Sequence, residues 1–459
     1  MARLHTLYLT ELDPMLPHLR RSGKTLLSRD AWKIRILLWS GAILVGLVAS
    51  GFAISSEHAN DWFHLLVDVS PYAPFVVCPL GLVLVSWLTR KFFPGSQGSG
   101  IPQSIAALQI PEHRSRTVLL SFRIAFGKIL LTLLGLLSGA SIGREGPTVH
   151  IGAAIMFSLG RFARFPHHYM DKGLILAGGA AGIAAAFNTP LAGILFAVEE
   201  MGRSFEERTS GVLLTAVFLA GVTAIAIQGN YTYFGSTSAI LETSQFLLPV
   251  LVCGVVGGLL GGLFSTALIQ GSRRLAPLLK RRPVAVAIVC GLGIASAGFL
   301  SGNTAYGTGY QEAEAIITGA STLPESYPLM KMLATLFSYL SGIPGGVFAP
   351  SLAAGAGVGA EIASWMPSLP VSAIVILGMV GYFTGVVQTP ITAFVIVMEM
   401  TDNHSLLLPL MATAFIAYIT SRLVCPEPIY RVLAVNFLPE APVSAPAEPR
   451  PTPPAKSQP

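Results

Sequence analysis

The fold of this chain is decided by the stretch SGASIGREGP at residues 138–147, which breaks an apolar segment with glycines and places Glu145 inside it. A second stretch, SGIPGGVFAP at residues 341–350, repeats its spacing, because Ser, Gly, Gly and Pro recur 203 positions later. Glycine-interrupted helices at corresponding points of two halves are typical of binding sites in membrane transporters. The two stretches therefore predict a duplicated transporter.

A further block of sequence supports the duplication. A shift of 200 positions aligns four residues with their counterparts: Gly178, Thr189, Pro190 and Glu199 with Gly378, Thr389, Pro390 and Glu399. The repeat halves are expected at roughly 34–228 and 245–435. Parallel and inverted repeats are both possible. We favour inverted repeats, because they bring the two broken stretches face to face near the middle of the membrane.

The composition is that of an integral membrane protein. Hydrophobic residues make up 52% of the 459 residues and charged residues 11%, and the mean hydropathy is +0.65. A spanning helix needs about 20 apolar residues, and uninterrupted apolar stretches occur at 34–54, 72–88, 211–228, 245–270, 284–300 and 405–420. Others are cut by Gly and Pro, at 118–160, 173–200, 328–363 and 370–400. We expect an all-α membrane protein in which the cut stretches form broken or re-entrant helices.

Three regions are expected along the chain. Residues 1–33 are polar and basic and predict a cytoplasmic arm with an interfacial helix, without a cleaved signal peptide. Residues 34–438 form the transport domain, and residues 439–459, rich in Pro and Ala, predict a disordered tail.

The positions of Lys and Arg predict the orientation. Basic residues gather near the first apolar stretch and at some of the connections: Arg20, Arg21, Lys24, Arg29, Lys33, Arg35, Arg90, Lys91, Arg203, Arg208 and the segment 273–282. Three connections, at about 55–70, 229–245 and 301–327, carry no Lys or Arg. Because cytoplasmic loops are enriched in basic residues, these three are expected outside the cell and both termini inside. The net charge of +6 then reflects orientation and not nucleic-acid binding.

Helices that begin inside the membrane can bind anions. Each start offers unpaired N–H groups and the positive end of the helix dipole, so two facing starts form an anion site without a buried Lys or Arg. Pro147 and Pro350 suit first turns, where no N–H is needed. GSGIP at residues 98–102 is a third candidate, with Ser99 as a hydroxyl donor. Close helix packing is the other role of membrane glycines, and it suits Gly257-Gly258 and Gly261-Gly262.

These motifs resemble the CLC family of chloride channels and chloride/proton antiporters. The matching strings, in the family's order, are GSGIP at 98–102, GREGP at 143–147, AFNTPLAG at 186–193, GVFAP at 346–350 and MEMTDN at 398–403. The resemblance covers about residues 34–435. It implies a CLC-type fold of two inverted-topology repeats and a homodimer with one pore in each subunit.

The resemblance also implies roles for single residues. Ser99 and Tyr430 would offer hydroxyls to a central chloride, and the backbone amides around Val347 and Phe348 would complete the site. Glu145 would be the external gating glutamate, and Glu200 the internal glutamate that transfers protons in family antiporters. Supporting positions are Gly98, Gly100, Ile101, Pro102, Gly143, Arg144, Gly146, Pro147, Gly346 and Lys128.

The sequence differs from the family pattern at some positions, and several of the assigned residues also have an alternative, purely structural role. Gln103 and Val347 replace a frequent Glu and Ile, and Ser99 matches chloride-selective members, whereas nitrate-preferring ones tend to have Pro. The ordinary roles are an interfacial anchor for Tyr430, a helix cap or a partner of Arg144 for Glu145, a solvated helix end for Glu200, and a snorkelling cation for Lys128.

The expected function is exchange of chloride for protons. The helix start that suits chloride also suits the carboxylate of Glu145, so the two should compete, and protonation of Glu145 should admit the anion. A passive voltage- or pH-gated chloride channel is the alternative, and Glu200 favours exchange over it. An intramembrane hydrolase using Ser138, Ser141, Ser341 or His150 is not expected, nor is any metal or cofactor. The expected partners are chloride, protons, the lipid bilayer and a second copy of the chain, in a bacterial inner membrane.

Overall fold

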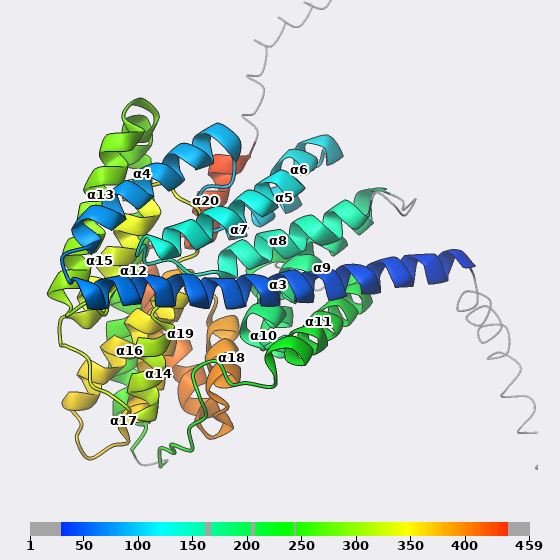
Figure 1. Ribbon diagram of the computed structural model, residues 1–459. Helices are drawn as coiled ribbons and strands as arrows, with labels where there is room; N and C mark the ends of the chain where they lie inside the picture. Colours follow the sequence, from blue (N-terminus) through cyan, green and yellow to red (C-terminus); the bar gives the residue numbers. More distant parts are fainter. Residues whose placement is uncertain (1–28, 161–166, 203–206, 243–244, 439–459) are drawn as a thin grey trace, which may run out of the picture.

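The computed structural model describes residues 29–160, 167–202, 207–242 and 245–438 (Figure 1). The tail expected at 439–459, residues 1–28 of the expected arm, and Arg203 lie outside the described residues. The described residues are helical, and their only β pairing is two isolated bridges. The first-half helices are α3 (Arg29–Val69), α4 (Pro74–Phe92), α5 (Ile101–Gln109), α6 (His113–Leu119), α7 (Phe122–Leu137), α8 (Glu145–Leu159), α9 (His167–Phe187), α10 (Pro190–Phe196), the π-helix η1 (Ala197–Gly202) and α11 (Glu207–Gln228).

The second half is also composed of long and short helices. Its helices are α12 (Leu247–Arg281), α13 (Pro283–Leu300), α14 (Tyr310–Thr318), α15 (Tyr327–Leu340), α16 (Phe348–Ser364), α17 (Val371–Val387), α18 (Pro390–Thr401), the 3-10 helix η2 (His404–Leu406), α19 (Leu407–Val424), α20 (Ile429–Ala434) and the 3-10 helix η3 (Val435–Phe437). Figure 1 shows α3 crossing the whole bundle, with short helices gathered on both sides of it.

Seven of the described helical segments are long and apolar enough to cross a membrane. They are Trp32–Val69, Pro74–Phe92, His113–Leu137, Gly211–Gln228, Leu247–Arg281, Pro283–Leu300 and His404–Val424. The expectation of broken helices is also confirmed: α7 ends at Leu137 and α8 begins at Glu145, and α15 ends at Leu340 and α16 begins at Phe348. Each break contains one of the two duplicated glycine stretches.

The two halves meet at a pair of equivalent residues. Gly143 and Gly346, which the 203-residue shift makes equivalent, form an antiparallel bridge. The Gly143 amide donates to the Gly346 carbonyl at 2.7 Å, and the Gly346 amide donates back at 2.8 Å. Equivalent residues can pair antiparallel with each other only if a local two-fold axis passes between them. Inverted repeats have such an axis, so the pairing agrees with that prediction.

A second pair of equivalent residues ties the halves together through side chains. Glu399 of α18 accepts hydrogen bonds from the amides of Leu191 and Ala192, at 3.2 and 2.7 Å, at the start of α10. Glu199 of η1 accepts from the amides of Ile391 and Thr392, at 3.2 and 2.6 Å, at the start of α18. Each carboxylate thus caps a helix of the opposite repeat, where free N–H groups and the helix dipole favour a negative charge. The alignment identified Glu199 and Glu399 as equivalent but gave no sign of this role.

Two buried lysines are also related by the shift of 203 residues. Lys128 of α7 donates to the carbonyls of Ser96 and Gly98, at 2.8 and 3.0 Å. Lys331 of α15 donates to those of Ala305, Tyr306 and Gly307, at 3.2, 2.8 and 2.9 Å. Both side chains are fully buried, so Lys128 does not snorkel to an interface. Each lysine fixes the loop that leads into a short helix, α5 or α14.

Glycines elsewhere serve helix packing, as the sequence suggested for the pairs at 257–258 and 261–262. A Cβ on Gly257 would come within 2.5 Å of the Gly381 and Tyr382 backbone, and one on Gly261 would come within 2.5 Å of the Tyr382 carbonyl oxygen. Helices α12 and α17 therefore touch along their backbones.

Candidate anion site

Three glycine-containing loops, distant in sequence, meet at one junction. The Gly98 amide donates to the Ile343 carbonyl at 3.1 Å, and the Gly345 amide donates to the Gly98 carbonyl at 3.2 Å. The Gly143–Gly346 bridge adds the third loop. Helices α5, α8 and α16 begin directly after these loops, at Ile101, Glu145 and Phe348. Three helix N-termini thus start from one junction, and their positive ends favour an anion there.

Ser99 lies at this junction with its hydroxyl available. Its side chain is fully buried, and its Oγ has no hydrogen-bond partner among the described residues. The hydroxyl lies directly against Gly146, where a Cβ would overlap Ser99 Oγ. Lys128 and Gln103 hold the loop from behind, since Gln103 Nε2 donates to the carbonyl of Gln97 at 2.7 Å. A buried hydroxyl of this kind requires a partner, and a bound anion would provide one.

Gly100 offers a direct test of the junction. Its φ of +105° is one that residues with side chains rarely adopt, and an added Cβ would lie 2.7 Å from the Gly146 carbonyl oxygen. We expect Gly100→Ala to lower the free energy of unfolding by about 1–3 kcal/mol from backbone strain alone, with a further contribution from the clash. Thermal unfolding in detergent measures this. Gly51→Ala is the control, because nothing lies within 4 Å of a Cβ there, and equal melting temperatures of the two variants would contradict the close approach.

Val347 and Phe348 form the start of α16. Val347 is the N-cap residue and Phe348 the first residue of the helix. Their side chains are buried, and the Phe348 ring packs against Phe187 and Phe383 with centroid distances of 5.4 and 4.3 Å. The side chains thus belong to the core, and the backbone amides of this first turn are the groups that can bind an anion.

The side chain of Glu145 extends from the start of α8 to the start of α16. It is the first residue of α8, it is fully buried, and its Oε2 accepts from the Ala349 amide of α16 at 3.4 Å. Its Oε1 has no hydrogen-bond partner within the described part of the chain. The ion pair of Arg144 is with Glu57, at 3.1 Å. The carboxylate of Glu145 therefore occupies the N-terminus of α16, where an anion is also favoured.

Tyr430 and Glu200 lie on another side of the same region. Tyr430 is buried in α20, which packs against α5, and its hydroxyl has no hydrogen-bond partner in the described ranges. It lies within electrostatic reach of both Glu145 and Glu200. Glu200 is only 2% exposed, within the π-helix η1. This burial does not fit a solvated helix end for Glu200 or an interfacial anchor for Tyr430.

Tyr339 is a candidate that the sequence analysis missed. A Cβ on Gly98 would lie 3.3 Å from its hydroxyl, and Tyr339 is within electrostatic reach of Tyr430. Its position in the regular amphipathic helix α15 gives no signal in the sequence, because only the tertiary fold brings that helix face to the Gly98 loop.

The residues considered for a hydrolase do not form a catalytic pair. The stretch 139–143 fits the Gly-x-Ser-x-Gly spacing of a nucleophile elbow, but Ser141 Oγ is hydrogen-bonded to Thr335 Oγ1 at 3.0 Å. His150 is buried, and its Nε2 is 2.9 Å from the Leu119 carbonyl oxygen. Both side chains therefore have structural partners, and the four cysteines are free and buried.

Comparisons with known proteins agree with this geometry. The family described as voltage gated chloride channel matches residues 80–422. The chain is 31% identical over 450 residues to the H(+)/Cl(-) exchange transporter ClcA of Cronobacter sakazakii, covering 90% of this chain and 92% of that protein. It is 29% identical over 447 residues to the ClcA of Yersinia pestis, covering 90% of each.

Solved structures share the fold. A slow cyanobacterial Cl-/H+ antiporter superposes with a TM-score of 0.77 at 24% identity, covering 87% of this chain and 97% of that one. A CLC-type fluoride/proton antiporter superposes with a TM-score of 0.74 at 23% identity, covering 88% of this chain and 99% of that one. The architecture of inverted repeats with broken helices is therefore that of these transporters.

Proposed function

The chain belongs to the voltage-gated chloride channel (CLC) family and is an integral multi-pass membrane protein, and from that premise we propose that it exchanges chloride for protons across the bilayer as a secondary active transporter. Its curated relatives bear the name of such an exchanger. We propose that this transport involves no enzymatic step and no cofactor.

The contact of Glu145 with the Ala349 amide carries this proposal. The same group of amides suits a carboxylate and a chloride ion, so only one of them can occupy it at a time. Protonation removes the charge of Glu145 and with it the attraction to the helix start. Chloride then enters, and its departure follows when the proton leaves and the carboxylate returns. One residue thereby couples the two fluxes.

Glu200 is proposed to pass protons between the cytoplasm and Glu145. A buried carboxylate at membrane depth is costly and marks a functional position, and Tyr430 lies within electrostatic reach of both glutamates. Chloride would approach between Ser99 and Tyr430, so the two routes share Glu145 and separate toward the cytoplasm.

Purified protein in liposomes tests the function. An outward chloride gradient is expected to drive protons inward against their own gradient, measured with a pH electrode. A passive chloride channel of the same fold is the second candidate, and it would give chloride flux without proton movement. The position of the anion is tested separately. In a structure determined at saturating bromide, we expect bromide density beside Ser99 and the start of α16.

Ser99→Pro tests the chloride ligand. The substitution removes the hydroxyl and the amide of residue 99, and we expect it to raise the preference for nitrate over chloride. Anion selectivity is measured from competition of nitrate with chloride uptake in liposomes. Ser104→Ala is the control, because Ser104 Oγ is bonded within α5 to the Gly100 carbonyl at 3.1 Å. Unchanged selectivity in Ser99→Pro would contradict the role of Ser99.

We further propose that two copies associate through the face formed by α10, α11, α18 and α19. Glu399 of α18 and Glu199 of η1, which directly follows α10, are half-buried, and lipid would solvate such carboxylates poorly. The flanking helices expose large apolar side chains, among them Phe218 of α11 and Leu408 and Ile419 of α19. We propose a bacterial inner membrane as the location, because the named relatives are bacterial proteins, and cytoplasmic termini, which the distribution of Lys and Arg favours.

A further inference from the structure

A polar pocket next to Arg144 collects the three connections that carry no Lys or Arg. Its lining residues are Ser56, Glu57, Asn60 and Asp61 of α3, Arg144, Tyr233 between α11 and α12, and Thr308, Tyr310 and Gln311 around the start of α14. Apart from Arg144, all of them fall within 55–70, 229–245 and 301–327, the segments expected outside the cell. The pocket therefore lies on the external approach to Glu145, the residue that follows Arg144.

Arg144 is held in this pocket by two different groups. Its side chain is 3% exposed, and its Nη1 donates to Glu57 Oε1 at 3.1 Å, whereas Glu57 is 53% exposed. The guanidinium carbon lies 5.8 Å from the centre of the Tyr233 ring. Arg144 Nε, also buried, has no hydrogen-bond partner among the residues described. A guanidinium with an unused N–H donor is suited to bind a small anion.

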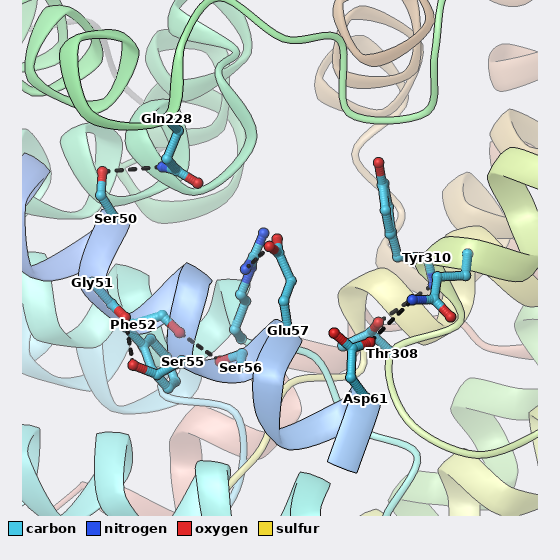
Figure 2. Close-up of polar contacts among 12 residues, drawn as sticks. Ser50, Gly51, Phe52, Ser55, Ser56, Glu57, Asp61, Gln228, Thr308 and Tyr310 are labelled. Atoms are coloured by element: carbon cyan, nitrogen blue, oxygen red, sulfur yellow. Dashed lines mark hydrogen bonds and ion pairs between the residues drawn. The ribbon is translucent and has the colours of Figure 1, made fainter. Parts of the chain in front are cut away.

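The two carboxylates of the pocket have different partners. Figure 2 shows Glu57 and Asp61 one helical turn apart on α3, with Asp61 beside Thr308 and Tyr310. Asp61 Oδ1 accepts from Gln311 Nε2 at 3.1 Å, so it does not hold Arg144. The titratable groups within electrostatic reach of Arg144 are Glu57, Glu145, Tyr231 and Tyr233.

The pocket is small and polar. It has room for about one water molecule or small ion. Asn60, 8% exposed, turns an Oδ1 without a hydrogen-bond partner in the described part of the chain toward Gly307. Arg144 and Asn60, which both line the pocket, thus each carry a buried polar atom without a hydrogen-bond partner among the described residues, a donor and an acceptor.

We propose that Glu57 sets the affinity of the external mouth for chloride, because its ion pair holds the guanidinium of Arg144 away from incoming anions. This inference rests on the proposed chloride transport. An anion that enters from outside competes with Glu57 for Arg144 on its way to the start of α8. Glu57 is therefore a positioning residue that acts through Arg144, and it makes the external side bind chloride more weakly than Arg144 alone would.

The test compares Glu57→Gln with Asp61→Asn. Both substitutions remove one negative charge from the same pocket, but only the first removes the charge that is paired with Arg144. Chloride dependence of exchange is measured in right-side-out and inverted membrane vesicles, against vesicles without the protein. We expect Glu57→Gln to lower the KM for external chloride by about threefold to tenfold, in line with the focusing of anions by an unpaired cation in a cleft. The KM for internal chloride and the maximal rate should stay unchanged.

The outcomes separate this inference from the function on which it rests. If wild-type vesicles show no chloride-coupled proton movement, the proposed function fails. If wild type exchanges and Glu57→Gln has the wild-type KM on both sides, the role of Glu57 is overturned. An equal fall of the external KM in Asp61→Asn would also overturn it, because the general field of the pocket would then account for the effect. A changed internal KM would mark a structural disturbance and contradict the proposed role.

Discussion

Glu145→Gln is expected to abolish proton transport while chloride still crosses the membrane. The amide has nearly the same size as the carboxylic acid, and its oxygen can still face the Ala349 amide, which lies 3.4 Å from the carboxylate in the wild-type protein. It carries no charge and exchanges no proton, so it behaves as a permanently protonated Glu145. No charged side chain then competes with chloride for the amides at the start of α16.

The measurement is simultaneous recording of chloride efflux and proton uptake from liposomes. Wild type should transport chloride faster at acidic than at alkaline pH, because protonation removes the competing carboxylate. Glu145→Gln should transport chloride at a rate that does not depend on pH in this way. Glu427→Gln is the control, since Glu427 is exposed on the loop before α20. Retained proton-coupled exchange in Glu145→Gln would rule out Glu145 as the coupling residue.

Glu200→Gln is expected to give the second largest effect, a loss of proton transport for a different reason. Glu145 remains able to take up protons, but the cytoplasmic route to it lacks its carboxylate. Chloride flux should therefore persist and keep its dependence on external pH, which Glu145→Gln should lose. This difference distinguishes the two roles in a single set of recordings.

The neighbouring residue provides a matched control for Glu200. Glu199 has the same chemistry, but its carboxylate caps α18 through the Ile391 and Thr392 amides. We expect Glu199→Gln to keep proton coupling. It should lower the free energy of unfolding by about 1 kcal/mol, as for a weakened helix cap. If Glu199→Gln loses proton transport and Glu200→Gln keeps it, the assignment of Glu200 is wrong.

The architecture was predictable because the signals that determine it are periodic or repeated. Apolar stretches, breaks by Gly and Pro, and the 203-residue spacing are all properties of the sequence itself. The break between α7 and α8 and the break between α15 and α16 occur where the glycine stretches predicted them. Ser99, Glu145 and Tyr430 are buried, and the roles inferred for them from the motifs stay predictions.

What the sequence did not reveal depends on contacts between distant segments. Glu57 lies within α3, 87 residues before Arg144, and nothing in the neighbouring sequence distinguishes it from the other polar residues of that helix. Tyr339 and Lys331 lie in the otherwise ordinary helix α15, and only folding brings them to loops near the site. Glu199 stands next to Glu200, and no sequence property shows that one carboxylate crosses to α18 while the other is buried beside Tyr430.

The crossed caps made by Glu199 and Glu399 bear on how such a chain arose. A gene that encoded a single half would yield a short helix whose first amides lack their carboxylate. A second copy inserted in the opposite orientation would supply the missing carboxylate. The first copy would in turn supply a carboxylate to the second. Within one polypeptide the two halves supply each other's caps permanently. Either half expressed alone should regain its cap only by pairing with the other.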